Sequence, residues 1–402
     1  MTRWAMLALV TLAYAAAALA ALAVAPLAPF LRDDLRLSPV EIGLLLPAVY
    51  LGGVLMSLPA GWLSDRLGVR PTLALGVTVT GLLVALAASI AAGLPLLLVC
   101  LIGAGFGFSV GNPATGKAVV DWFPSSERGM AMGIKQTGLT LGGIAGALLL
   151  PVVAAEFGWR SALTVAGAIA MSSLAVVALY RSPLWEEDTD APAPPRLSEL
   201  EVFLARRGVR VLFAGGFLLS MVQASLLAHF ALYARESFGI SSVAAGQLLA
   251  LTQAGGTANR LVWGLVSDRV LGGRRRPGVV ATALLGAGAC VVFALDHALP
   301  RAMLWILAPL AGAGAFGWVG LYFALVAEIG GARHAGLLTG VAVACAWSGV
   351  LVGPPLFGLV VEATGGYAAA WLLLAGIAVS VAIALACLPP LVRREPVTTR
   401  DA

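Results

Sequence analysis

The 402-residue chain is poor in charge and almost devoid of lysine. Only 11% of its residues are Asp, Glu, Lys or Arg, whereas 60% are apolar, and Lys117 and Lys135 are its two lysines. A soluble domain carries about 25% charged residues. Together with a mean hydropathy of +0.96, this shortage excludes an ordinary soluble domain and predicts an integral membrane protein.

The chain also lacks the residue groupings of enzymes and metal proteins. Its four cysteines show no CxxC spacing, its three histidines form no cluster, and HExxH and paired carboxylates are missing from the apolar runs. We therefore expect no enzymatic activity, no metal site and no cofactor. The net charge of +5 does not point to a nucleic-acid partner, because membrane topology explains the arginines better.

What the sequence contains is a series of twelve apolar runs separated by charges or Gly/Pro clusters. Each is treated as a helix that crosses ~30 Å of hydrocarbon, because backbone groups in lipid must bond within their own segment. We therefore expect an all-α membrane protein with twelve transmembrane helices. The predicted spans are 4–30, 40–63, 71–92, 95–121, 130–155, 159–180, 209–234, 242–266, 278–295, 300–327, 336–361 and 367–390.

Arginine is unevenly distributed between alternate loops. With both termini cytoplasmic, seventeen arginines fall on the cytoplasmic side and five on the outside. Positive charge accumulates in cytoplasmic loops. The chain is therefore expected in the cytoplasmic (inner) membrane of a bacterium, with both termini inside the cell.

Two sequence patterns occur twice, in the same order. GWLSDRLGVRP at 61–71 is matched by GLVSDRVLGGRRRP at 264–277, and the segment 118–133 is matched by 324–340. Between the copies, residues 181–208 have the Pro-rich, acidic composition of a linker. This pattern predicts two pseudo-symmetric six-helix bundles, 1–180 and 209–402, an architecture of secondary transporters.

The stretch GWLSDRLGVRP resembles the cytoplasmic loop signature of the major facilitator superfamily, and the resemblance extends over essentially the whole chain. It implies a transporter that works by alternating access, commonly as a monomer. In the family, the acid of this loop pairs with a helix end and nearby arginines to hold the outward-open state. The latch residues implied here are Gly61, Asp65, Arg66, Gly68 and Arg70, with Gly264, Asp268 and Arg269 in the second copy.

Two cations are predicted deep in the membrane, where charged side chains are costly and tend to be functional. Lys135 lies eight residues beyond Glu127, or ~12 Å along a helix. It shares a helix face with Gly138, Gly142 and Gly146. Because glycine stripes mark close helix contacts in membranes, Lys135 should point into the protein. No acid is predicted at this depth.

Arg260 repeats this placement in the second half, eight residues before Asp268. RLVWGLVSD, which begins at Arg260, is similar to the eighth helix of monocarboxylate transporters and the oxalate–formate group. That resemblance implies that Arg260 binds a substrate carboxylate, which suits the two-pronged guanidinium. The eleventh span lacks the lysine of the oxalate group, so a dicarboxylate would require Lys135 for its second charge.

The remaining candidates carry weaker signals. Lys117 lies four residues before Asp121 and is expected mainly to snorkel to the surface, next to the site. His229 is a candidate for proton coupling, with a hydrogen-bonded packing role as the alternative. The other candidate substrate-binding residues are polar or aromatic side chains within the spans: Gln136, Asn112, Asn259, Gln253, Gln223, Tyr14, Tyr50, Trp318 and Tyr322.

Cations without acids at mid-depth predict a cavity of positive potential, which attracts anions. The sequence therefore predicts a secondary active transporter of a small organic anion such as a carboxylate. Proton symport, anion exchange and facilitated diffusion all stay open. The alternative is a proton-coupled drug exporter. The GPP at 353–355 is compatible with an exporter, but the membrane-embedded acid that an exporter would need is missing.

Overall fold

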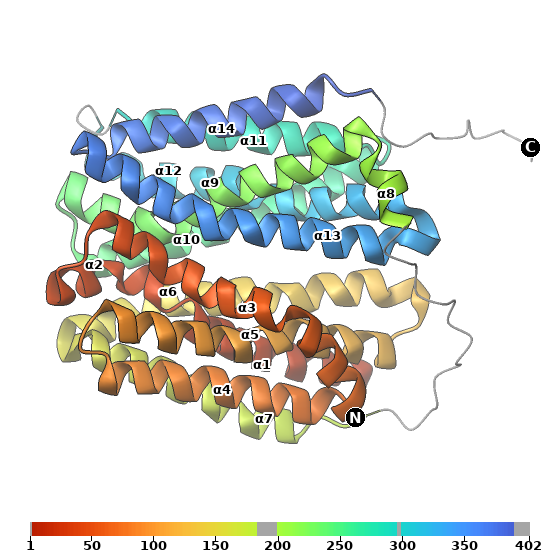
Figure 1. Ribbon diagram of the computed structural model, residues 1–402, viewed down its shortest axis with the longest axis horizontal. Helices are drawn as coiled ribbons and strands as arrows, with labels where there is room; N and C mark the ends of the chain where they lie inside the picture. The colour runs from red at the N-terminus through yellow and green to blue at the C-terminus, as the bar shows by residue number, and fades with distance from the viewer. Residues whose placement is uncertain (1, 183–198, 296–298, 390–402) are drawn as a thin grey trace, which may run out of the picture.

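The computed structural model describes residues 2–182, 199–295 and 299–389 (Figure 1). Within these ranges the chain is helical, and apart from a single 3₁₀ turn at Arg301–Met303 all the helices are α-helices. They are α1 (Arg3–Ala21), α2 (Val24–Leu35), α3 (Pro39–Leu67), α4 (Val69–Ile90), α5 (Leu94–Trp122), α6 (Ser125–Ser172), α7 (Leu174–Ala178), α8 (Glu199–Leu204), α9 (Arg207–Phe238), α10 (Ser242–Arg269), α11 (Arg276–Phe293), α12 (Leu304–Phe316), α13 (Trp318–Thr364) and α14 (Ala368–Ala386).

The two longest helices each contain one glycine at which the chain turns back. Gly158 in α6 and Gly331 in α13 have φ values of 81° and 60°, which glycine adopts without a Cβ clash. Ten described stretches are long and apolar enough to cross a membrane. The turn at Gly158 divides one of them in two, and the more polar α10 adds another. The predicted all-α fold with twelve crossings is confirmed, although the first crossing is made of two helices, α1 and α2.

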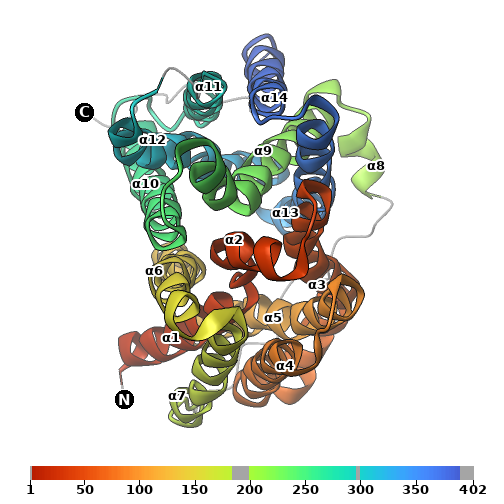
Figure 2. The same cartoon turned by 90° about the vertical axis from the view of Figure 1, so that its left-hand side faces the viewer.

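The helices form two groups that lie side by side (Figure 1). Helices α1–α7 make up the N-terminal group and α8–α14 the C-terminal group. The groups meet where α2, α3 and α6 face α9, α10 and α13, as the end-on view in Figure 2 shows. Most of the predicted linker lies outside the described residues, and its last part forms α8.

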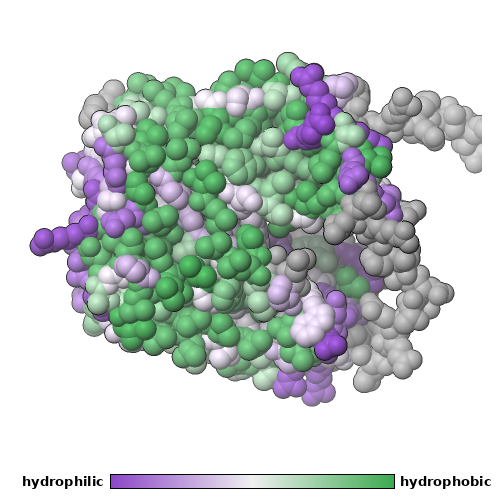
Figure 3. Space-filling view, in the orientation of Figure 1, coloured by the Kyte–Doolittle hydropathy of each residue, from purple (hydrophilic) through white to green (hydrophobic). Residues whose placement is uncertain are grey.

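Helix α1 begins and α14 ends at the same end of the molecule, which we call the terminus end; the opposite end is the distal end. Figure 3 shows a broad apolar surface between the two ends, with hydrophilic residues gathered at its margins. This distribution is what a bundle surrounded by lipid requires, because apolar side chains face the hydrocarbon and charged groups reach water.

The glycine stripe of α6 packs directly against α1. A Cβ on Gly138 would lie 2.6 Å from the carbonyl oxygen of Thr11, and one on Gly142 would lie 2.2 Å from that of Ala15. Only glycine permits so close an approach of two backbones. The face predicted to point into the protein therefore does so, and it carries Lys135 with it.

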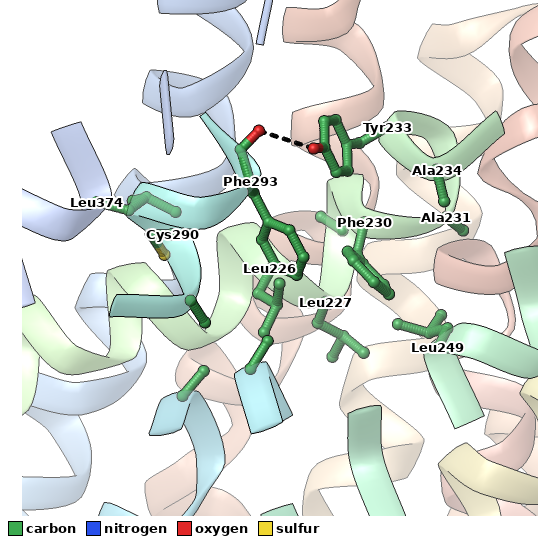
Figure 4. Packing of buried hydrophobic residues seen from close by; sticks show 14 of the residues in the cluster. Leu226, Leu227, Phe230, Ala231, Tyr233, Ala234, Leu249, Cys290, Phe293 and Leu374 are labelled. Atoms are coloured by element: carbon green, nitrogen blue, oxygen red, sulfur yellow. Dashed lines mark hydrogen bonds between the residues drawn. The ribbon is translucent and has the colours of Figure 1, made fainter. Parts of the chain in front are cut away.

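Near the distal end of the C-terminal group, an aromatic cluster joins α9, α11 and α14 (Figure 4). The Tyr233 hydroxyl donates a hydrogen bond of 2.7 Å to the carbonyl oxygen of Phe293. The ring of Tyr233 meets those of Phe293 and Trp371 at centroid distances of 5.6 and 5.1 Å. Such packing makes this part of the group a stiff unit.

Candidate substrate-binding site

The two helix groups approach each other closely toward the distal end. A Cβ on Gly43 of α3 would lie 2.5 Å from the carbonyl oxygen of Pro354 in α13. In α10, a Cβ on Gly246 would lie 2.6 Å from the carbonyl oxygen of Ala147 in α6. Contacts this short between backbones leave no room for water, so the seam is closed here.

Toward the terminus end the same helices part. A Cβ on Gly61 of α3, Gly133 of α6, Gly264 of α10 or Gly340 of α13 would have no neighbouring atom within 4 Å. Figure 3 shows the surface hollowed between the two groups at this end. The space between the groups is therefore closed at the distal end and open at the terminus end.

Lys135 lies on α6 and is only 4% exposed. Its ammonium donates hydrogen bonds to the backbone oxygen of Asn112 at 3.3 Å and to the side-chain oxygen at 2.5 Å. It also lies 5.7 Å from the ring centroid of Tyr14 on α1. No described carboxylate forms an ion pair with it. These neutral partners orient the ammonium but leave its positive charge uncompensated.

Arg260 is the corresponding cation of the C-terminal group. Its Nε donates a hydrogen bond of 2.9 Å to the carbonyl oxygen of Phe316, which fixes the guanidinium relative to α12. Its other two nitrogens donate to none of the described residues, and none of their carboxylates pairs with it. The forked end of the guanidinium is therefore free to bind an external acceptor.

Two tyrosines of the N-terminal group connect these cations. Tyr50 on α3 lies in the neighbourhood of Arg260 and of Tyr14, and Tyr14 lies beside Lys135. Neither hydroxyl makes a hydrogen bond within the described part of the chain. The structure thus brings one cation from each group and two phenols into the same region, although the four residues lie far apart in sequence.

Two further residues border this arrangement. The Gln253 amide of α10 lies against Gly143 of α6, where a Cβ would come 2.1 Å from its oxygen. Trp347 of α13 meets the Tyr50 ring edge to face at a centroid distance of 5.6 Å. Sequence reasoning missed Trp347, since one tryptophan in an apolar span is typical of packing and its neighbourhood with Tyr50 arises only from the contact between α3 and α13.

Several predicted candidates lie elsewhere. Trp318 and Tyr322 were predicted to line the cavity, but each is 1% exposed and packs inside the C-terminal group, so they do not face the space between the groups in this conformation. The Asn259 amide donates to the Ala313 carbonyl at 2.8 Å and ties α10 to α12. Lys117 forms an ion pair with Asp121 at 3.4 Å, as expected for an anchoring lysine.

The last two glutamines are less informative. Gln136, next to Lys135, is partly exposed. The side-chain oxygen of Gln223 on α9 is buried and has no hydrogen-bond partner in the described structure.

His229 is completely buried in α9. Its Nε2 lies 2.9 Å from the carbonyl oxygen of Pro354, and its ring lies 4.8 Å from that of Phe357. These contacts match the alternative predicted for it, a hydrogen-bonded packing histidine. Since the closed seam covers it, His229 has no path to water in this conformation.

The two copies of the loop motif differ in their contacts. Asp65 is exposed and forms no ion pair with the described residues, while Arg66 stacks on Trp62 at 4.6 Å. In the second copy, Asp268 pairs with Arg275, whose Nε also donates to Glu328 at 3.0 Å. The latch role of these residues stays a prediction: a latch for the outward-open state should be released when the terminus end is open.

A bundle of twelve crossings in two groups, open at one end and holding on each side a cation without a described carboxylate partner, has the architecture of a secondary transporter. The chain belongs to the Major Facilitator Superfamily, whose sequence profile matches residues 10–349. It is therefore a multi-pass membrane transporter and not an enzyme.

Individual relatives agree with this assignment. The chain is 25% identical over 386 residues to the hexuronate transporter of Bacillus subtilis. The aligned region covers 89% of this chain and 88% of that protein. It is 25% identical over 406 residues to a probable sulfoacetate transporter of Cupriavidus necator, covering 91% and 89%. A bacterial homologue of the human lysosomal transporter Spinster, in an inward-facing and unoccupied conformation, has the same fold, with a TM-score of 0.74, 18% identity and coverage of 96% and 95%.

Proposed function

We propose that this protein transports a small organic anion, with a carboxylate as the group bound between Lys135 and Arg260. The observation that carries the proposal is the pair of cations, buried Lys135 on one helix group and half-buried Arg260 on the other, neither of which pairs with a described carboxylate. The relatives named for hexuronate and sulfoacetate support it, because both compounds are organic anions.

The chemistry of the two cations suits an anion. The free prongs of Arg260 match the two oxygens of a carboxylate, and a charge-assisted pair of this kind is about twice as strong as a neutral hydrogen bond. Lys135 supplies a second positive charge, and the hydroxyls of Tyr14 and Tyr50 can donate to further oxygens. A lipophilic cation would meet repulsion from both sides.

Because the two cations lie on opposite helix groups, binding of the substrate can favour closure of the open end. Without an anion, Lys135 and Arg260 repel each other and oppose closure of the open end. A bound anion neutralises both charges and attracts the groups toward each other. We place both termini in the cytoplasm on the distribution of arginine, so the structure corresponds to an inward-open conformation.

The test is a binding and uptake comparison of Arg260→Gln with wild type. Purified protein is screened by thermal shift against glucuronate, short monocarboxylates, dicarboxylates, inorganic anions and lipophilic cations, since a ligand of the folded state stabilises it. We expect an organic anion to raise the melting temperature of wild type and of Lys117→Gln, the matched lysine control, but not of Arg260→Gln. Labelled uptake of the same anion should fall to background in Arg260→Gln.

Two outcomes would refute the proposal. If Arg260→Gln takes up the anion at the wild-type rate, the assignment of the site is wrong. If lipophilic cations alone stabilise the wild type, the sign of the cavity has been misjudged and the drug exporter becomes the better description.

A further inference from the structure

The closed distal end is held by charges exchanged between the two helix groups. On α2 of the N-terminal group, Arg32 and Asp33 are consecutive; on α9 of the C-terminal group, Arg235 and Glu236 are consecutive. Arg32 pairs with Glu236 at 2.9 Å, and Arg235 pairs with Asp33 at 2.5 Å. Each group thus gives an arginine to the acid of the other.

This exchange follows from the internal duplication. Helices α2 and α9 end the first crossing of their respective groups, and each carries an arginine followed by an acid at that point. Parallel repeats of this kind are related by an axis along the membrane normal. Where two equivalent segments meet across a two-fold axis, residue i of one contacts residue j of the other and the reverse. The reciprocal ion pairs have this pattern.

Neighbouring groups support the exchange from both sides of the seam. Arg235 also donates to the Pro29 carbonyl at 2.9 Å, and the Tyr367 hydroxyl donates to the second oxygen of Glu236 at 2.6 Å. Burial, with the Glu236 carboxylate in second place, raises the pKa of the Tyr367 phenol, so this donor keeps its proton at neutral pH. On α13, Glu362 accepts from the backbone N–H of Val40 at 2.9 Å, at the start of α3.

The charged contacts at the terminus end have a different arrangement. Among the described residues, Arg3 pairs with Glu127 and Lys117 with Asp121 inside the N-terminal group, while Arg275 pairs with Asp268 and Glu328 inside the C-terminal group. The described ion pairs that cross between the groups are those of the distal end. They must therefore break when the distal end opens.

We propose that the reciprocal pairs Arg32–Glu236 and Arg235–Asp33 form the distal gate of this transporter and set how often it opens. Both pairs are partly exposed. A pocket of about 560 Å³ beside the Arg32–Glu236 pair, lined also by Glu362 and Tyr367, admits water and salt. Partly exposed pairs stabilise modestly. The gate therefore holds the seam closed while still allowing it to open during transport.

Asp34, which follows Asp33 directly, provides a matched control for the loss of an aspartate charge from α2. Asp34 pairs with Arg160 at 2.8 Å and accepts from the Trp159 indole at 2.8 Å, both inside the N-terminal group. Replacing either aspartate by asparagine removes the same charge from the same turn of α2. Only Asp33→Asn removes a contact between the groups.

Opening is measured at Ala25, seven residues before Arg32, or ~10 Å deeper along α2. Ala25 is 3% exposed and packs in a cluster with residues of α9. A cysteine placed there reacts with a polar maleimide only when the seam parts. Purified Ala25→Cys protein in nanodiscs is labelled over time, and mass spectrometry of the peptide separates this cysteine from the four native ones.

We expect Asp33→Asn and Glu236→Gln each to raise the labelling rate about two- to fivefold, the ratio typical of losing one partly exposed ion pair. Together they should raise it about tenfold, whereas Asp34→Asn should match the parent. The charge exchange Asp33→Arg with Arg235→Asp should restore slow labelling. Raised ionic strength should accelerate labelling of the parent and less so of the double variant.

Equal rates in the Asp33→Asn and Asp34→Asn proteins would overturn the proposal, as would fast labelling in the charge-exchanged protein. A double variant that fails to fold leaves the single variants and the exchange to decide. The inference rests on the proposed transport function but not on the substrate, and labelling requires no ligand. A failure of the anion site would therefore leave this result intact, and the reverse also holds.

Discussion

Replacing Lys135 by methionine should make the unliganded protein more stable while abolishing its response to anions. Lys135 is 4% exposed and has no described carboxylate partner. A buried, uncompensated charge lowers the stability of the folded protein unless a ligand neutralises it. Methionine keeps the length of the side chain and removes the charge, so the substitution separates stability from binding.

The magnitude follows from the contacts of the ammonium. A lysine at the centre of a transmembrane helix costs about 2.5–3.5 kcal/mol on insertion scales. Its hydrogen bonds to Asn112 and its position over the Tyr14 ring offset a part, about 1–2 kcal/mol for bonds and cation–π contacts of this type. We therefore expect Lys135→Met to raise the free energy of unfolding by about 1 kcal/mol.

The assay compares melting temperatures in detergent with and without the anion identified in the screen. At a ligand concentration of 100 times Kd, wild type should gain about 2.7 kcal/mol from binding, and Lys135→Met should gain nothing measurable. Lys117→Met is the control. It breaks the ion pair with Asp121, so it should lower stability slightly, by about 0.3–0.5 kcal/mol for a pair four residues apart, and retain the ligand response.

A less stable Lys135→Met protein would refute this reasoning. Lys135 would then hold α5 and α6 together through Asn112, and its role would be structural. A stabilised variant that still responds fully to the anion would show that the charge is uncompensated but lies outside the binding site.

Two further predictions concern packing and are checked by thermal unfolding in detergent. Gly142→Ala should lower the free energy of unfolding by about 1–3 kcal/mol, as overpacking does, because its Cβ would lie 2.2 Å from the Ala15 carbonyl oxygen. The control Gly133→Ala should be neutral or stabilising, because its Cβ meets no atom within 4 Å. Equal effects of the two substitutions would contradict the close contact. Tyr233→Phe removes the hydrogen bond to Phe293 and should lower the free energy of unfolding by about 0.5–1.5 kcal/mol. Tyr322→Phe should leave the free energy of unfolding unchanged, because the hydroxyl of Tyr322 is buried without a described partner.

Much of the fold could be predicted from the sequence because lipid imposes simple rules. A run of about 20 apolar residues must form a helix, so the number of crossings followed from composition along the chain. The depth of Lys135 and Arg260 followed from counting 1.5 Å per residue from the nearest loop. The glycine stripe gave the face of α6 that packs on α1, and the repeated loop motif gave the family.

The candidate site could be predicted only in part. Trp318 and Tyr322 have the same residue types and predicted depth as side chains that line a cavity, yet they pack inside the C-terminal group. Nothing local distinguishes the two situations, because the difference lies in which neighbouring helix covers the face. Trp347 was missed for the converse reason, since its contact with Tyr50 depends on the approach of α13 to α3.

The sequence by itself determined that the protein crosses the membrane twelve times, that its halves repeat each other, and that each half carries one cation inside an apolar run without an acid at the same predicted depth. Hydrophobicity and helical rise are local properties, so no tertiary information was needed. Only the tertiary structure decided which polar groups meet: that Lys117 forms an ion pair and Lys135 does not, that Tyr14 lies beside Lys135, and that Arg32 and Arg235 exchange acids across the distal seam. Contacts between the groups depend on how two bundles dock, and that is set by shape and charge over many residues together.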